Sequence, residues 1–223
     1  MIEAVVFDLD GVLLDTEELW DEARRQIAEE RGGRWRPEAQ RAMMGMSSPG
    51  WSRYMHDVIG VPDPPDRISD EVVERLAELY RRELPLVDGA IEAVRRIGAR
   101  WPLGIASSSN RPLIDLFVEL TGTRDLFRAT VSSEEVAHGK PAPDVYLEAA
   151  GRLQVGPESC AAIEDSENGI RSARAAGMHV VAIPNRVFPP STEALALADV
   201  VLGSPAELMP ETVELASDAR RRD

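Results

Sequence analysis

The chain has 223 residues, of which 43% are hydrophobic and 29% charged, as expected for a globular protein with one large domain or a core plus an insertion. Its formal net charge of -14 argues against a nucleic-acid-binding surface, because phosphate backbones select basic surfaces. The apolar runs have the length of strands rather than of membrane spans, and a strand-like segment opens the chain, so we expect neither a membrane partner nor a signal peptide.

Short apolar runs alternate with helix-like segments along most of the chain. They are mostly continuous, which is typical of strands covered on both faces. The predicted strands are 3–8, 103–107, 129–132, 160–164, 179–183 and 199–202. The predicted helices among them are 89–100, 111–122, 143–153 and 168–177. This alternation predicts βαβ units and a parallel sheet.

Residues 16 to 83 interrupt the alternation. They contain no convincing strand, and within 67–84 the apolar residues recur with helical spacing. We therefore expect a helical insertion between the first strand and the rest of the sheet. The expected domains are an α/β core formed by 1–15 together with 84–223, and a helical cap formed by 16–83.

Acidic residues follow two of the predicted strands. Asp8 and Asp10 come after the first, and residues two apart in an extended segment point the same way. For this pair alone, a polar turn is an equal alternative. Glu164 and Asp165 end the fourth strand, at the same sheet edge, so the four carboxylates would repel one another without a cation among them. Oxygen ligands beside a substrate phosphate favour Mg²⁺.

Polar residues 107–110, Ser-Ser-Ser-Asn, end the second predicted strand. Hydroxyl groups and free backbone N–H groups at the start of a helix form an anion site. The same residue types are also common helix caps, so this segment alone is a weak signal.

Lys140 is the only lysine of the chain, and every other residue in the Lys+Arg count of 25 is arginine. It lies in the loop between the third predicted strand and the next helix, where it could pair with an acidic group and with phosphate oxygens. A compact ammonium is not equivalent to the planar fork of arginine. The alternative is a lysine on a solvated face, but its place in a strand-end loop favours the functional interpretation.

Four segments, taken in order, resemble the motifs of the haloacid-dehalogenase-like (HAD) hydrolases: FDLDGVLLDTE, IASSS, HGKPAPDVY and IEDSENGI. The resemblance covers nearly the whole chain and is strongest to the β-phosphoglucomutase-like and sugar-phosphatase branch. It implies an α/β fold with a Rossmann-like parallel-sheet core and an inserted small all-helical cap. It also implies that the cap opens and closes about hinges near 14–15 and 84–85.

The resemblance implies catalytic roles for two carboxylates. Asp8 would attack phosphorus and form an aspartyl-phosphate, and Asp10 would act first as general acid and then as general base. Ser107, Ser108 and Lys140 would hold the transferring phosphoryl group and neutralise its charge.

The resemblance also implies a metal cofactor. Mg²⁺ would be bound by Asp8, by the backbone carbonyl of Asp10 and by Asp165, with Glu164 in or near its coordination shell.

Several activities occur in the family. Dehalogenases lack the second acid, Asp10, and phosphonatases use a cap lysine that is absent here. The mutases carry a histidine and an arginine where this chain has Trp20 and Ser48, although Arg41 or Arg53 could replace that arginine. We therefore predict a Mg²⁺-dependent phosphatase for small phosphate monoesters, such as sugar or polyol phosphates. The alternatives are a β-phosphoglucomutase-type mutase and, more remotely, a non-catalytic phosphate-binding regulatory module.

Substrate choice would lie in the cap. The candidate specificity residues are Glu18, Trp20, Met44, Met46, Ser47 and Trp51. Packing within the cap is the alternative for some of these, including Trp20 and Met44. Glu17 and Glu22 are expected on a solvated helix face.

The lone cysteine, Cys160, excludes an intramolecular disulfide and suggests a reducing compartment. We expect a cytoplasmic monomer whose partner is a small phosphorylated metabolite.

Overall fold

Six parallel strands form one sheet, in the order β3-β2-β1-β4-β5-β6. The structure is a computed structural model, and it describes residues 1–43 and 46–219. The strands are β1 (Ala4–Phe7), β2 (Leu103–Ser107), β3 (Phe127–Ser132), β4 (Cys160–Glu164), β5 (His179–Ala182) and β6 (Val200–Val201). The predicted α/β fold with a parallel sheet is confirmed.

The central strands are continuously apolar because both of their faces are covered. Every residue of β1, β2, β4 and β5 is buried. Side chains alternate along β1: Ala4 and Val6 belong to one hydrophobic core, Val5 and Phe7 to the other. The sheet is therefore the middle layer of three.

Helices form the two outer layers. They are α5 (Ala90–Gly98), α6 (Arg111–Leu120), α7 (Asp144–Leu153), α8 (Glu167–Ala175), α9 (Thr192–Leu195) and α10 (Pro210–Ala219). Short 3-10 turns lie at Arg124–Leu126, Ser133–Glu135, Pro157–Ser159 and Pro205–Glu207. Buried residues of α5, α6 and α10 share the core of Val5 and Phe7, whereas those of α7 and α8 share the other core. Among the described residues, no helix has the length and apolar character needed to cross a membrane.

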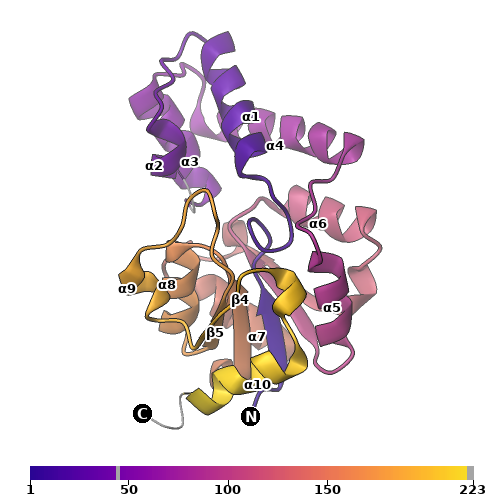
Figure 1. The fold of residues 1–223 in the computed structure, drawn as a ribbon. Helices are drawn as coiled ribbons and strands as arrows, with labels where there is room; N and C mark the ends of the chain where they lie inside the picture. The colour runs from indigo at the N-terminus through magenta and orange to yellow at the C-terminus, as the bar shows by residue number, and fades with distance from the viewer. Residues whose placement is uncertain (44–45, 220–223) are drawn as a thin grey trace.

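A group of helices stands beyond the end of the sheet toward which β1 points (Figure 1). It consists of α1 (Glu17–Glu30), α2 (Ala39–Met43), α3 (Ser48–Tyr54), a π-helical turn (Met55–Ile59) and α4 (Pro65–Arg82). Helix α4 contacts both α1 and α3. We call residues 16–83 the helical segment, and each regular element in its described part is a helix. Its status as a separate domain stays a prediction.

The two connections between the helical segment and the sheet run side by side. Leu14 and Leu86 form an antiparallel bridge, and the N–H of Asp15 donates to the carbonyl of Pro85 at 2.8 Å. The N–H of Val87 donates to the carbonyl of Leu13 at 3.1 Å. These bonds lie where the sequence predicts hinges. A change of backbone conformation in one connection would therefore alter the hydrogen bonds of the other connection as well.

Candidate functional site

The chain turns sharply after β1. The carbonyl of Leu9 accepts hydrogen bonds from the N–H groups of Leu13 at 2.8 Å and Leu14 at 3.0 Å. Gly11 has a φ of +86°, and a Cβ atom there would lie 1.9 Å from Oδ2 of Asp165. Glycine is therefore required both by the backbone and by the close approach of this turn to the end of β4.

A buried lysine joins the ends of β1 and β4. Nζ of Lys140 donates to Oδ1 of Asp8 at 2.7 Å and to Oε1 of Glu164 at 2.6 Å, and the lysine side chain is only 3% exposed. Glu164 also accepts from the Tyr146 hydroxyl at 2.7 Å and, through Oε2, from the backbone N–H of Asp165 at 3.1 Å. The acids expected at one sheet edge and the lone lysine thus lie together.

The same place has more negative than positive charge. Carboxylate oxygens of Asp8, Glu164 and Asp165 lie within 4.8 Å of one another, and all three residues are buried. Burial raises the pKa of Asp8 to about 8 although Lys140 opposes the shift, and burial together with Glu164 raises the pKa of Asp165. Oδ1 of Asp165 is buried without a hydrogen-bond partner among the described residues.

These features fit a bound cation. The unpartnered oxygen of Asp165 would gain a partner, and the excess negative charge would be offset. Because the possible metal ligands are all carboxylate oxygens, a hard ion such as Mg²⁺ suits the site. Asp10 is not among the three converging side chains, and its predicted contribution through the backbone carbonyl stays a prediction.

The Asp10 carboxylate is held from both sides. Oδ1 accepts from Oγ1 of Thr16 at 2.6 Å and from Nε1 of Trp20 at 3.3 Å, both at the start of the helical segment. Oδ2 accepts from Oγ of Ser109 at 2.5 Å and, more weakly, from Oγ of Ser107 at 3.4 Å. The sequence analysis did not single out Thr16 or Ser109 as individual site residues, because hydroxyl residues are common at strand ends and helix caps.

The loop after β2 lies against the loop after β3. Oγ of Ser107 accepts from the N–H of Ser109 at 2.9 Å. Oγ of Ser132 donates to the carbonyl of Ser109 at 2.7 Å, and Oγ of Ser133 donates to the carbonyl of Ser107 at 3.1 Å. The hydroxyl of Ser108 is buried without a partner among the described residues. The loop after β3 thus holds the backbone of the loop 107–110 in place.

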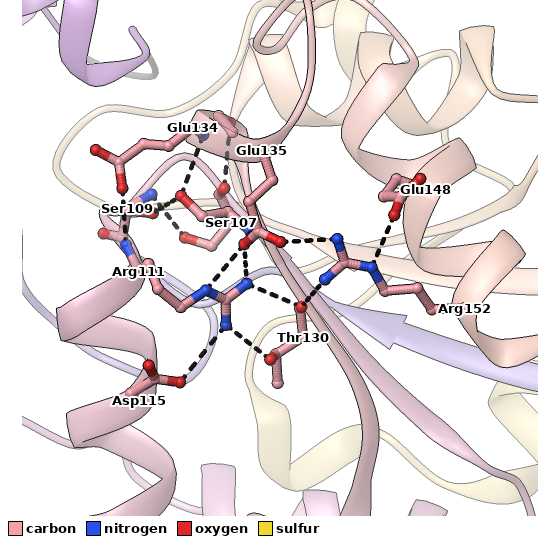
Figure 2. Close-up of polar contacts among 11 residues, drawn as sticks. Ser107, Ser109, Arg111, Asp115, Thr130, Glu134, Glu135, Glu148 and Arg152 are labelled. Carbon is pink, nitrogen blue, oxygen red and sulfur yellow. Dashed lines mark hydrogen bonds and ion pairs between the residues drawn. The ribbon is translucent and has the colours of Figure 1, made fainter.

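Two arginines extend this support (Figure 2). Nε of Arg111 donates to Oε1 of Glu135 at 2.9 Å, and its Nη1 donates to Oγ1 of Thr130 at 2.8 Å. Nη2 of Arg152 donates to Oε2 of Glu135 at 2.7 Å. The carboxylate of Glu135 therefore ties α6 and α7 to the end of β3, next to the loop 107–110.

A cavity of about 570 Å³ lies between the strand ends and the helical segment. Its lining from the strand-end loops includes Asp8, Asp10, Ser108, Ser109, Lys140 and Asp165. Its lining from the helical segment consists of Glu17, Trp20, Arg24, Arg41, Met43, Met46 and Trp51. The predicted catalytic residues Asp8 and Asp10 therefore line one cavity.

The candidate specificity residues have different places. Trp20, Met46 and Trp51 line the cavity. Ser47 lies against the loop that carries the lysine, since a Cβ atom on Gly139 would come within 3.0 Å of the Ser47 Cβ. Met44 lies outside the described residues.

Two adjacent glutamates lie differently from the expectation relative to this cavity. Glu18 is exposed and does not line the cavity, whereas Glu17, expected to be solvated, does. Adjacent helical residues are separated by about 100° around the axis, so only one of the pair can face the cavity. The spacing of 17, 20 and 24 is the signal that could have identified Glu17 and Arg24 once Trp20 was directed toward the site.

The haloacid dehalogenase-like hydrolase family matches residues 2–177, so the chain belongs to this family of hydrolases. This confirms the family expected from the four motifs. The chain is 34% identical to a probable pseudouridine-5'-phosphatase of Drosophila melanogaster, over 92% of this chain and 91% of that protein. It is 32% identical to hexitol phosphatase B of Escherichia coli (strain K12), over 93% of this chain and 94% of that protein.

A solved structure has the same fold. CbbY from Rhodobacter sphaeroides, in complex with phosphate, superposes with a TM-score of 0.85 at 30% identity. The match covers 96% of this chain and 100% of that chain.

The close approach at Gly11 predicts that Gly11→Ala displaces Asp165. In the wild type, we expect Mg²⁺ to raise the midpoint of thermal unfolding, because a ligand that binds the folded state stabilises it. The variant should lose this rise. Gly122→Ala is the control, since Gly122 has a φ of +62° but nothing within 4 Å, and it should cost about 1–2 kcal/mol yet keep the response to Mg²⁺. A normal response in Gly11→Ala would contradict the prediction.

The contacts of Glu135 predict a pH-dependent contribution to stability. Partial burial opposes the shift, but hydrogen bonds from Arg111, the backbone of Ser132 and Arg152 lower the pKa of Glu135 from 4.5 to about 2. Because the folded-state pKa is the lower one, the stabilisation is complete above pH 4.5 and is lost as the pH falls toward 2.

Urea unfolding should therefore show Glu135→Gln to be less stable than wild type at pH 7, with the difference narrowing between pH 4.5 and pH 2. Glu193→Gln, which changes an exposed glutamate, should show no such trend. A pH-independent difference for Glu135→Gln would rule out the ionised carboxylate as its source.

Proposed function

We propose that this chain is a Mg²⁺-dependent phosphatase that hydrolyses phosphate monoesters of small metabolites, with sugar or polyol phosphates as the substrate class. One observation carries the proposal: the buried Asp8 is bonded to Lys140 and lines a cavity that Asp10 also lines. Membership of a hydrolase family and similarity to proteins named as phosphatases support it.

The reaction would proceed in two displacements. An oxygen of Asp8 attacks phosphorus, and the bond from phosphorus to the ester oxygen breaks while Asp10 donates a proton to the leaving alkoxide. Water then attacks the aspartyl-phosphate, Asp10 takes the proton, and inorganic phosphate leaves with Asp8 restored. The four donors around Asp10 fix the direction of its carboxylate for both steps.

Charge stabilisation would come from groups that are already in position. The ammonium of Lys140 is held by two carboxylates, so it can face the phosphoryl oxygens without reorganisation. Ser133 and Ser132 hold the carbonyls of Ser107 and Ser109 in the loop after β2. The Ser108 hydroxyl, which has no partner among the described residues, and the N–H groups of this loop would then be available to the phosphoryl group.

Asp8 and Asp165 would hold Mg²⁺, together with the carbonyl of Asp10. Both oxygens of Glu164 already accept hydrogen bonds, so its main contribution would be to hold Lys140 beside the ion. When bound, the ion supplies positive charge opposite the phosphoryl oxygens.

The helical segment, residues 16–83, would act as a cap over a core formed by 1–15 and 84–223. Its contact with Asp10 through Thr16 and Trp20 supports a closed arrangement in which the cap completes the site. The expected monomeric state and cytoplasmic location stay predictions.

A neutral contact supports hydrolysis rather than a mutase reaction. Ser48, which occupies the position of the mutase arginine, is buried, and its Oγ donates to Oδ1 of Asn110 at 2.8 Å. Nδ2 of Asn110 donates to Oε1 of Glu134 at 2.7 Å. No positive charge is present in this contact to retain a second phosphate. Of the two arginines that could replace the mutase arginine, Arg53 is exposed, whereas Arg41 lines the cavity, so the mutase stays the alternative that the assay below must exclude.

Phosphate release from a panel of metabolites tests the function. Hexose 6-phosphates, hexitol phosphates, phosphoglycolate and pseudouridine 5'-phosphate should include at least one ester hydrolysed with Mg²⁺ and not with EDTA. Asp8→Asn should abolish release, whereas the exposed Asp88→Asn should retain it. No release, with conversion of β-glucose 1-phosphate to the 6-phosphate, would establish the mutase instead. Full activity of Asp8→Asn would refute the nucleophile.

The geometry around Lys140 predicts that a positive charge at this position is not enough for catalysis and that the compact shape of the ammonium is also needed. Lys140→Arg keeps the positive charge but cannot fit a planar fork at 2.7 Å and 2.6 Å from two separate carboxylates. We expect a fall in kcat of roughly 10²–10³-fold, the cost of losing one preorganised donor. Arg128→Lys, at an exposed position, is the reciprocal control and should be neutral. A wild-type kcat in Lys140→Arg would contradict the requirement for a compact ammonium.

A further inference from the structure

A second buried cation lies on the helical side of the cavity. Arg24 is 5% exposed, and its guanidinium carbon lies 4.5 Å from the ring centroid of Trp20 and 4.8 Å from that of Trp51. Burial lowers its pKa to about 10, which leaves it charged at neutral pH. The two aromatic rings therefore position a guanidinium in a wall of the space that contains Asp8 and Lys140.

The guanidinium has unused hydrogen-bonding capacity. Among residues 1–43 and 46–219, its hydrogen bond is the one from Nη1 to Oε1 of Gln40, at 3.3 Å, and its buried Nε has no partner. An arginine offers five N–H donors, and buried donors without partners are destabilising. A substrate that supplies acceptor oxygens would satisfy part of this capacity.

A carboxylate lies beside the guanidinium. Nε2 of Gln40 donates to Oε2 of Glu17 at 3.0 Å and to the Glu17 carbonyl at 3.2 Å, so one amide links Glu17 to Arg24. Glu17 also lines the cavity. The wall therefore offers donors and an acceptor next to each other, both fixed by a residue that does not itself line the cavity.

We propose that Arg24 and Glu17, positioned by Gln40, bind the hydroxyl groups of the organic part of the substrate. A hydroxyl both accepts and donates, so neighbouring hydroxyls of a sugar or polyol can accept from Arg24 and donate to Glu17. The Glu17 carboxylate, next to the guanidinium, can accept a hydrogen bond from a hydroxyl but would repel a second phosphate. The inference rests on the proposed phosphatase activity and names the residues that select its substrate class.

Two esters test the subsite: sorbitol 6-phosphate, with a hydroxylated tail, and 4-nitrophenyl phosphate, without one. Arg24→Met keeps an apolar stem between the tryptophans but removes the donors. We expect kcat/KM for sorbitol 6-phosphate to fall about 10- to 100-fold, mainly through KM, and that for 4-nitrophenyl phosphate to stay within about threefold. Arg25→Met, at the next position but directed toward Glu22 and Glu29, should change neither.

Glu17→Gln provides a second variant with little change in shape. If Arg24→Met does not fold, this variant tests the proposed subsite instead. It should also lower kcat/KM for sorbitol 6-phosphate selectively. Gln40→Leu should do so with an unchanged pH profile for 4-nitrophenyl phosphate, as a positioning residue requires.

Four results would overturn the subsite. Equal losses for both esters would make Arg24 structural. A selective loss for fructose 1,6-bisphosphate, with sorbitol 6-phosphate unaffected, would make it a second-phosphate site. A wild type that hydrolyses 4-nitrophenyl phosphate but no hydroxylated ester would refute the subsite and leave the phosphatase standing, whereas no hydrolysis of any ester would refute both.

Discussion

The ammonium of Lys140, shared between the carboxylates of Asp8 and Glu164, is the contact on which the rest of the site depends. A buried charge is tolerated only where it is paired and hydrogen-bonded, so the ends of β1 and β4 must keep their register for this cluster to exist. The tight turn at Gly11 and the hydroxyl of Tyr146 meet the same requirement. The glycine allows the turn after β1 to approach the end of β4, and the hydroxyl completes the hydrogen bonding of Glu164. The cluster also places Asp8 and Lys140 in the lining of one cavity.

The sheet could be predicted because burial on both faces leaves a clear signal. Strands β2 and β4 have the predicted bounds, since every residue in them is buried. Strand β3 begins two residues before its prediction, at Phe127, because the exposed Arg128 interrupts the apolar run. Strand β6 is shorter than predicted and only partly buried, as the last strand at the sheet edge. The first residues of a strand and the residues of an edge strand are thus harder to predict from the hydrophobic pattern than those of central strands.

The meeting of the strand-end residues could be predicted from the sequence, whereas the helix faces that line the cavity could be predicted only in part. Asp8 and Lys140 follow strands, and the topology of a parallel sheet fixes where strand ends meet. The direction of a helix face depends on packing between distant elements, which no local spacing specifies. For this reason the sequence analysis did not place Glu17 and Arg24 in the cavity lining, although their spacing from Trp20 contained the information once one member of that helix face was known.

The confinement of lysine to one buried position has a chemical consequence for the whole molecule. Lys140 carries the only side-chain amine, and that side chain is 3% exposed. Every other residue in the Lys+Arg count is arginine, whose guanidinium group acylating and reductively alkylating reagents leave unmodified at neutral pH. The α-amino group is the other amine that these reagents modify. Once the label on the α-amino group is counted separately, covalent labelling of a side-chain amine in this protein therefore reports on Lys140 alone. Its rate measures how often the ion cluster opens to solvent.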